Sequence, residues 1–155
     1  MKFRFSWLII AAFILFSCAS GKKARTRKIE KVVQTARSYT GTPYKYGGTT
    51  RSGIDCSGLL VASFKSADIS LPRTAKEQSK YGKGVSKDEL KEGDLVFFSA
   101  KPGRRKITHA GMVTEVRSKD HVRFIHSSTS LGVVEANLFS DYYRKIFVKA
   151  RRPKY

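Results

Sequence analysis

Beyond residue 94 the chain changes from helical periodicity to a succession of short β-rich runs. These runs read LVFFSA, ITHAGMVTEV, HVRFIHSS, GVVEANL and YRKIFVKARR, and polar or glycine-containing turns separate them. Runs rich in β-branched and aromatic residues, bounded by turns, are typical of consecutive antiparallel strands. The sequence therefore predicts a mostly antiparallel sheet of about five to six strands in this part of the chain.

The preceding part of the chain carries helical patterns instead. Apolar residues from Lys28 onward recur at helical spacing, and Gly41 ends this pattern two residues before Pro43. A second, buried helix is expected to begin near Cys56, in CSGLLVASF, and the capping-box signatures TAKE and SKDE predict short helical pieces after it. The order of elements indicates an α+β fold with N-terminal helices packed on one sheet.

The first 17 residues, MKFRFSWLIIAAFILFS, have the cationic start and apolar core of a signal peptide. The core 6–16 is shorter than the roughly 20 apolar residues that a transmembrane helix needs. LFSCAS resembles a bacterial lipobox, which implies lipidation of Cys18 and predicts a lipidated tether over 18–27, followed by one domain over 28–155. An ordinary secretory signal with an incidental cysteine is the alternative.

The formal net charge of +19 indicates polyanionic partners. An exported lipoprotein meets no genome, and no nucleic-acid-binding motif is present, so we expect no nucleic-acid partner. Carboxylate-bearing cell-wall peptides and anionic lipid surfaces fit the compartment better. A merely solvated basic surface is the alternative.

Cys56 stands where a glycine-rich loop gives way to an apolar run. If lipid occupies Cys18, Cys56 is a lone thiol in an oxidising compartment, where structural thiols usually pair. Asp55 is a possible cap for the helix, and a helix N-terminus is expected to lower the pKa of the thiol and favour a nucleophile. A small core residue is the alternative.

A nucleophilic cysteine needs a base, and the chain offers His109, His121 and His126. A hairpin through RSKD would place His109 and His126 on adjacent strands, facing one helix end. His121 lies at the edge of that turn and is expected to meet solvent. For either strand histidine, a core position is the alternative reading. No metal-ligand spacing and no phosphate-binding glycine motif is present, so we expect neither a metal nor a cofactor.

Several motifs occur in the order found in one known family. PYKYGGTTRSGIDCSGLLVASF, LPRTAKEQ, EGDLVFF, HAGMV and FIHSSTSLGV resemble the NlpC (p-sixty) cell-wall peptidases, a papain-like superfamily, over about Lys28 to Arg152. Together with the leader they look most like the Spr-type murein endopeptidase lipoproteins. The resemblance implies Cys56 as nucleophile, His109 as general base and His126 as the third, orienting residue.

The resemblance also assigns a supporting group. It implies Tyr44 near the oxyanion and Asp55 and Ser57 in holding the substrate peptide, although Tyr44 could be a packing aromatic and Asp55 only a helix cap. Tyr46 is the preferred packing candidate. Arg73 and Asp94 are interpreted as structural and left outside the site.

One departure from the Spr type is the longer spacing between His109 and His126, which predicts a longer hairpin here. The pattern FIHSSTSLGV nevertheless favours His126 over His121 as the third residue.

Together these features predict a monomeric cysteine endopeptidase of peptidoglycan stem peptides. The resemblance implies that the bond cut is either the D-Ala–diaminopimelate cross-link or the γ-D-glutamyl–diaminopimelate bond, and the sequence does not separate them. A non-catalytic wall-binding lipoprotein of the same fold is the rival function. Ala19, rather than an aspartate, follows Cys18, which predicts lipid anchoring in the outer membrane, facing the periplasm.

Overall fold

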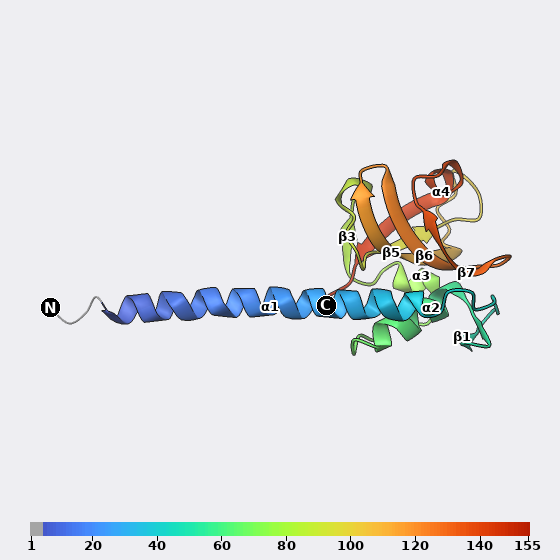
Figure 1. The fold of residues 1–155 in the computed structure, drawn as a ribbon. Coiled ribbons are helices and arrows are strands. Elements are labelled where there is room, and N and C mark those ends of the chain that lie inside the picture. Colours follow the sequence, from blue (N-terminus) through green and yellow to red (C-terminus); the bar gives the residue numbers. More distant parts are fainter. Residues whose placement is uncertain (1–4) are drawn as a thin grey trace.

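The computed structural model describes the backbone from residue 5 and the side chains from residue 21 to the C-terminus. Its main feature is a six-stranded sheet in the order β3-β8-β4-β5-β6-β7, in which all neighbours are antiparallel (Figure 1). The strands are β3 (Lys83–Val85), β4 (Leu95–Phe98), β5 (His109–Ser118), β6 (His121–Ser128), β7 (Gly132–Asn137) and β8 (Phe147–Arg152). This confirms the predicted α+β architecture.

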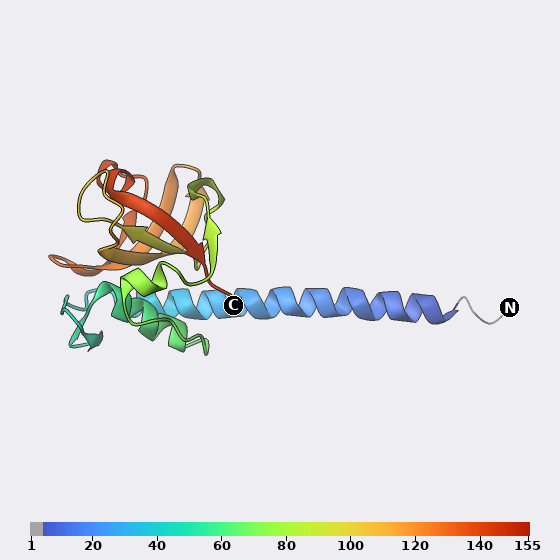
Figure 2. The same cartoon turned by 180° about the vertical axis from the view of Figure 1, so that it is seen from behind.

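The helices are α1 (Phe5–Arg37), α2 (Cys56–Lys65), α3 (Ala75–Gln78) and α4 (Asp141–Ile146), with a 3-10 helix at Lys87–Glu89. The helix expected from Lys28 is wrong in its start, because α1 already includes 18–27. Lysine, arginine and alanine in GKKARTRK favour a helix, and one glycine does not stop it. The N-terminal part of α1 projects away from the sheet (Figures 1 and 2).

The side chain of Cys18 and those of the predicted leader lie outside the described residues. No helix in the described part of the chain combines the length and apolar character that crossing a bilayer requires.

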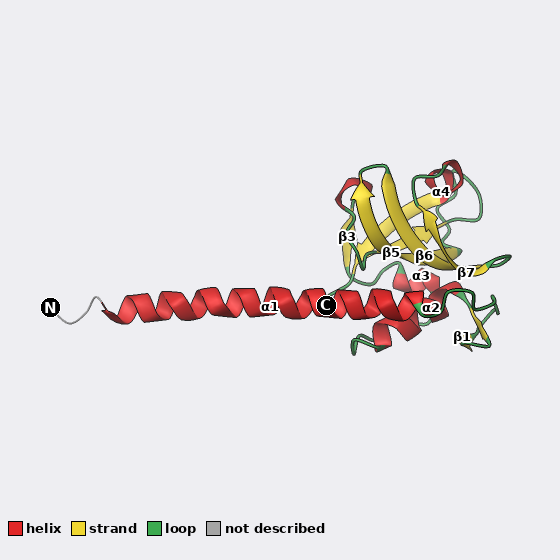
Figure 3. Cartoon of the chain, in the orientation of Figure 1, coloured by secondary structure: helices red, strands yellow, loops and turns green. Residues whose placement is uncertain are grey.

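One face of the sheet packs against α1 and α2 (Figure 3). Val32, Val33 and Ala36 of α1 and Leu59, Leu60 and Phe64 of α2 are buried here. Across the interface lie Leu95, Phe97, Ala110, Met112 and Ile125 of the sheet. Because this apolar contact fixes α2 on the sheet, it also fixes the cysteine at the start of α2.

A second apolar cluster lies on the opposite side of β4, β5 and β6, under α4. The expected strand 143–152 is therefore wrong in its first part, since Tyr143 belongs to α4 and β8 begins only at Phe147. Asp141 in the first turn suits the positive end of this short helix. The sequence also missed two short paired strands, β1 (Thr49–Thr50) and β2 (Gly53–Ile54), and β3.

The predicted hairpin between β5 and β6 is confirmed, with Ser118 paired to His121 next to the turn. Gly111, near the start of β5, lies tightly against β6. A Cβ atom at this position would be 2.7 Å from the Phe124 ring, 2.8 Å from the Ile125 carbonyl oxygen and 3.2 Å from His126 Cβ. The small residue is needed because the neighbouring strand, rather than a substrate, approaches it.

Gly111→Ala should therefore lower the free energy of unfolding by about 1–3 kcal/mol, the usual cost of overpacking a core. Gly84→Ala on β3 is the matched control, because a Cβ there would meet only the Arg151 guanidinium at 3.7 Å. Urea denaturation of both variants measures the difference. Equal stability of the two variants would show that the tight contact at Gly111 relaxes without cost.

Candidate active site

The N-terminus of α2 is built around the Asp55 carboxylate, as the sequence predicted. Asp55 caps the helix, accepting a hydrogen bond of 2.6 Å from the Gly58 amide. Its other oxygen accepts one of 2.9 Å from the Gly47 amide in the preceding loop. A Cβ on Gly58 would collide with the Gly48 carbonyl oxygen, so glycine lets this loop close over the helix start. Cys56 is thereby held as the first residue of α2.

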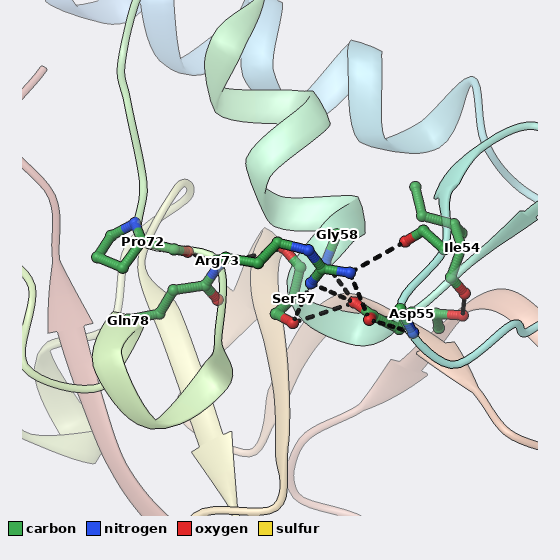
Figure 4. Close-up of polar contacts among 10 residues, drawn as sticks. Ile54, Asp55, Ser57, Gly58, Pro72, Arg73 and Gln78 are labelled. Carbon is green, nitrogen blue, oxygen red and sulfur yellow. Dashed lines mark hydrogen bonds and ion pairs between the residues drawn. The ribbon is translucent and has the colours of Figure 1, made fainter.

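Arg73 completes this arrangement (Figure 4). Its guanidinium donates to both oxygens of Asp55, at 3.0 and 2.7 Å, and to Ser57 Oγ at 2.9 Å. Ser57 Oγ in turn donates to Asp55 at 3.0 Å. Burial alone would raise the pKa of Asp55, but the hydrogen bonds from Arg73, Gly58 and Ser57 lower it below its ordinary value. Asp55 is therefore an ionised carboxylate that holds Arg73 at the site.

Arg73 was interpreted as structural, and its place at the site was missed. It lines the same open pocket as Asp55, Cys56 and Ser57, and its side chain is 40% exposed. Gln78 of α3, fully buried, donates to the Pro72 carbonyl at 2.8 Å and to the Ser57 carbonyl at 3.1 Å, which ties the segment before Arg73 to α2. The sequence signal was present in LPRTAKEQ, where Arg73 immediately precedes the cap of α3.

The pocket has a volume of about 470 Å³ and includes Tyr44 and Tyr46 on its wall. Tyr44 is half-buried, and burial followed by the negative charges of Cys56 and Asp55 raises its pKa, so its hydroxyl stays protonated. Tyr46 was expected to be the packing aromatic. That expectation is wrong, because Tyr46 is 89% exposed.

The Cys56 thiol is nearly buried, with 8% of the residue exposed. Backbone amides of Ala110, Ser57 and Cys56 itself direct hydrogen bonds to it and favour the thiolate, but burial outweighs them and raises the pKa of the thiol. The expectation that the helix N-terminus would lower this pKa is therefore wrong. The Ala110 contact places the sulfur beside the first residues of β5.

His109 is the first residue of β5, and His126 lies on β6. Their rings are joined by a hydrogen bond of 2.9 Å between His109 Nε2 and His126 Nδ1. Burial lowers the pKa of His109 to about 4, and burial together with the charge of His109 lowers that of His126 to about 3. Both rings are therefore neutral near pH 7.

His121 lies at the other end of β6, paired with Ser118 at the turn. It is half-buried rather than solvent-facing, and its Nε2 atom is buried without a hydrogen-bond partner among the described residues. The structure thus brings His126, and not His121, to His109.

The second residue that the sequence did not reveal is Tyr143 of α4. Its hydroxyl is 2.9 Å from His126 Nε2, so both ring nitrogens of His126 are engaged. Tyr143 lies in the segment expected to be a strand, and it is distant in sequence from every motif that pointed to the site. Only a correct assignment of α4 could have indicated it.

The lowered pKa values of half-buried His109 and buried His126 predict acid-sensitive stability. The unfolded imidazoles titrate near pH 6.5, whereas the folded ones titrate at about 4 and about 3. Below about pH 6.5 the unfolded chain binds more protons, so the free energy of unfolding, full above that pH, falls progressively down to about pH 3. Urea denaturation at several pH values measures this slope.

Replacing both His109 and His126 by glutamine should flatten the slope between pH 6.5 and 5, where most carboxylates remain ionised. Cys56→Ala, which removes no histidine, is the control and should keep it. A slope that persists unchanged in the double variant would contradict burial of the neutral pair.

The chain is similar to known proteins in both sequence and fold. The NlpC/P60 family model matches residues 41–152, somewhat less than the predicted resemblance from Lys28. The chain is 38% identical over 158 residues to "Probable endopeptidase NlpC" of Escherichia coli K12, with 96% of this chain and 99% of the relative covered.

A second relative is "Murein DD-endopeptidase MepS/Murein LD-carboxypeptidase" of E. coli K12, 35% identical over 123 residues, covering 79% of this chain and 61% of the relative. Among solved structures, an NlpC/P60 family protein from Bacillus cereus ATCC 10987 superimposes with a TM-score of 0.72 and 31% identity, covering 80% of this chain and 39% of the other. Sequence and fold agree over most of the chain, which belongs to the NlpC/P60 family.

Proposed function

We propose that this protein is a cysteine endopeptidase that hydrolyses amide bonds in peptidoglycan peptides. The observation that carries the proposal is the thiol of Cys56 at the start of α2, beside the strand that begins with His109. Family membership and the names of the murein and NlpC endopeptidase relatives support a hydrolase acting on peptidoglycan. To this activity we add the proposal that Cys56 is the nucleophile.

In this mechanism His109 takes the proton of the Cys56 thiol. His126 holds Nε2 of His109, which leaves Nδ1 as the basic nitrogen for the thiol. Because the resting pair is neutral, we place this proton transfer together with substrate binding, when the sulfur attacks the amide carbonyl carbon. A carbon–sulfur bond forms, and the carbonyl oxygen becomes an oxyanion.

The oxyanion would be met by the Cys56 backbone amide and the Tyr44 hydroxyl, where one such donor is worth about 3 kcal/mol. The imidazolium of His109 then gives its proton to the leaving amine as the carbon–nitrogen bond breaks. Water, deprotonated by His109, hydrolyses the thioester and restores the thiol. Arg73, held by Asp55 and Ser57, presents a fixed positive charge on the pocket wall.

Charge near the pocket supports a carboxylate-bearing substrate. The segment 101–106, KPGRRK, is exposed and leads directly to Ile107 and Thr108 on the pocket wall. None of its cations forms an ion pair within the described part of the chain. Stem peptides of peptidoglycan supply carboxylates for such a surface. Two bonds are candidates, the D-Ala–diaminopimelate cross-link and the γ-D-glutamyl–diaminopimelate bond. Mass spectrometry of the products distinguishes them.

Substitution at the proposed catalytic residues tests the mechanism. Cys56→Ala and His109→Asn should release no soluble muropeptides from purified sacculi, because nucleophile and base have no substitute. His126→Gln should keep measurable activity through one hydrogen bond to His109. His126→Ala should lose far more, up to about 10⁴-fold, the loss seen when the orienting group of a serine-protease triad is altered.

His121→Ala is the matched control and should turn over almost normally, with the folding of each variant checked by circular dichroism. Loss of turnover in His121→Ala, with His126→Ala active, would show that His121, and not His126, is the third residue. If Cys56→Ala released products as well as the wild type, a cysteine mechanism would be ruled out.

We also propose that Cys18 carries lipid and anchors the protein in the outer membrane of a diderm host, facing the periplasm. The lipobox-like LFSCAS and the alanine at position 19 support this. More than one acyl chain makes anchoring stable, whereas one chain binds only marginally.

Cys18→Ala should therefore move the protein from the membrane to the soluble fraction or leave its leader uncleaved. Fractionation with mass determination of the mature N-terminus measures both. Ser17→Ala, beside the cysteine but without a thiol to lose, is the control. An unchanged membrane fraction and mass for Cys18→Ala would remove the basis for the anchor.

A further inference from the structure

We propose that Tyr143 is a positioning residue that gives the productive tautomer of His126 a hydrogen-bond partner and, through it, favours a proton on Nε2 of His109. The proposal rests on the cysteine mechanism above and adds a fourth member to it. Tyr143 does not line the pocket, and its hydroxyl is hydrogen-bonded to His126. Its action on His109 is therefore indirect, through the ring of His126 on β6.

The geometry is a line of three side chains from three elements. His109 Nε2 on β5 lies 2.9 Å from His126 Nδ1 on β6, and His126 Nε2 lies 2.9 Å from the Tyr143 hydroxyl on α4. His126 is 2% exposed, so water has little access to either nitrogen. A buried N–H without a partner is costly, so the two neighbours decide which nitrogen carries the proton.

The direction of each hydrogen bond follows from the proposed role of His109 as general base. To accept the thiol proton, neutral His109 needs a free lone pair on Nδ1, which puts its own proton on Nε2. His126 Nδ1 must then accept a hydrogen bond from this Nε2–H, so neutral His126 carries its own hydrogen on Nε2. The Tyr143 oxygen accepts from this N–H. Each step permits only one arrangement once the first is set.

The opposite tautomer would disable the base. If His126 carried its proton on Nδ1, it would donate to His109 Nε2 and leave the His109 proton on Nδ1, facing the thiol. Tyr143 would then have to donate to His126 Nε2. A phenol can do either, so what matters is that its oxygen gives the buried Nε2–H a partner in the productive arrangement.

Packing holds Tyr143 in place for this role. The centroid of its ring lies 5.5 Å from that of Phe98 and 4.8 Å from that of Phe124. Phe124 in turn stacks on His126, with 5.0 Å between the ring centroids. Burial raises the pKa of Tyr143, so it remains a neutral phenol at physiological pH. Its neighbour Tyr142 is 64% exposed and contacts Tyr143 edge to face, without a hydrogen bond to either histidine among the described residues.

Tyr143→Phe keeps the ring and removes only the acceptor, and Tyr142→Phe is the matched control. We expect kcat for muropeptide release to fall by about tenfold or more in Tyr143→Phe, the effect of one unpaired buried donor, with KM little changed. Tyr142→Phe should equal the wild type. In a His126→Gln background, adding Tyr143→Phe should have little further effect, because an amide has no second tautomer.

Nitrogen-15 NMR of the histidine rings tests the tautomer directly in the wild-type chain, independently of activity and of how any variant folds. We expect a protonated Nε2 and an unprotonated Nδ1 on His126, and a mixture or the reverse in Tyr143→Phe. A protonated Nδ1 in the wild type, or an active wild type that Tyr143→Phe leaves unchanged, would overturn the inference. An inactive wild type with the expected tautomer would instead contradict the proposed function alone.

Discussion

The Asp55 carboxylate is the interaction on which the rest of the site depends. It accepts five hydrogen bonds, from the Gly47 and Gly58 amides, from Ser57 and twice from Arg73. A carboxylate offers about four lone-pair sites, so these donors occupy all of them. One side chain thereby joins the loop before α2, the first turn of α2 and the segment before α3. Its role is therefore to position Cys56 and Arg73, and it has little capacity left for a substrate.

Burial is the second constraint, and it opposes the helix terminus. Amides at the start of α2 would favour a thiolate, but removal of water from Cys56, His109 and His126 favours the uncharged form of each. A neutral resting pair avoids a buried ion pair, whose desolvation can exceed its attraction. In the mechanism that we propose, charge separation is then needed only when a substrate carbonyl is present to share it.

The sequence predicted the parts that local patterns encode. The β-rich runs up to 137, the cap at Asp55 and the turn between β5 and β6 depend on neighbouring residues, and they were correct, whereas the first part of the run 143–152 was not. Tyr143 and Arg73 were not found, because their partners lie far away in the chain, His126 by 17 residues and Asp55 by 18. The exposure of Tyr46 was also missed, since an aromatic residue in a loop gives no sign of which way its ring faces.

The 17-residue spacing between the two histidines is compatible with their contact. His109 and His126 lie 17 residues apart, yet their rings meet, because the pairing of Met112 with Ile125 fixes the register near the start of β5. The register shifts of this hairpin fall between Val113 and Ser118, on the side towards the turn. Irregularity there lengthens the hairpin without moving the paired residues beside Gly111, where the site is built. The position of His126 beside His109 is thus set by strand register at the base of the hairpin.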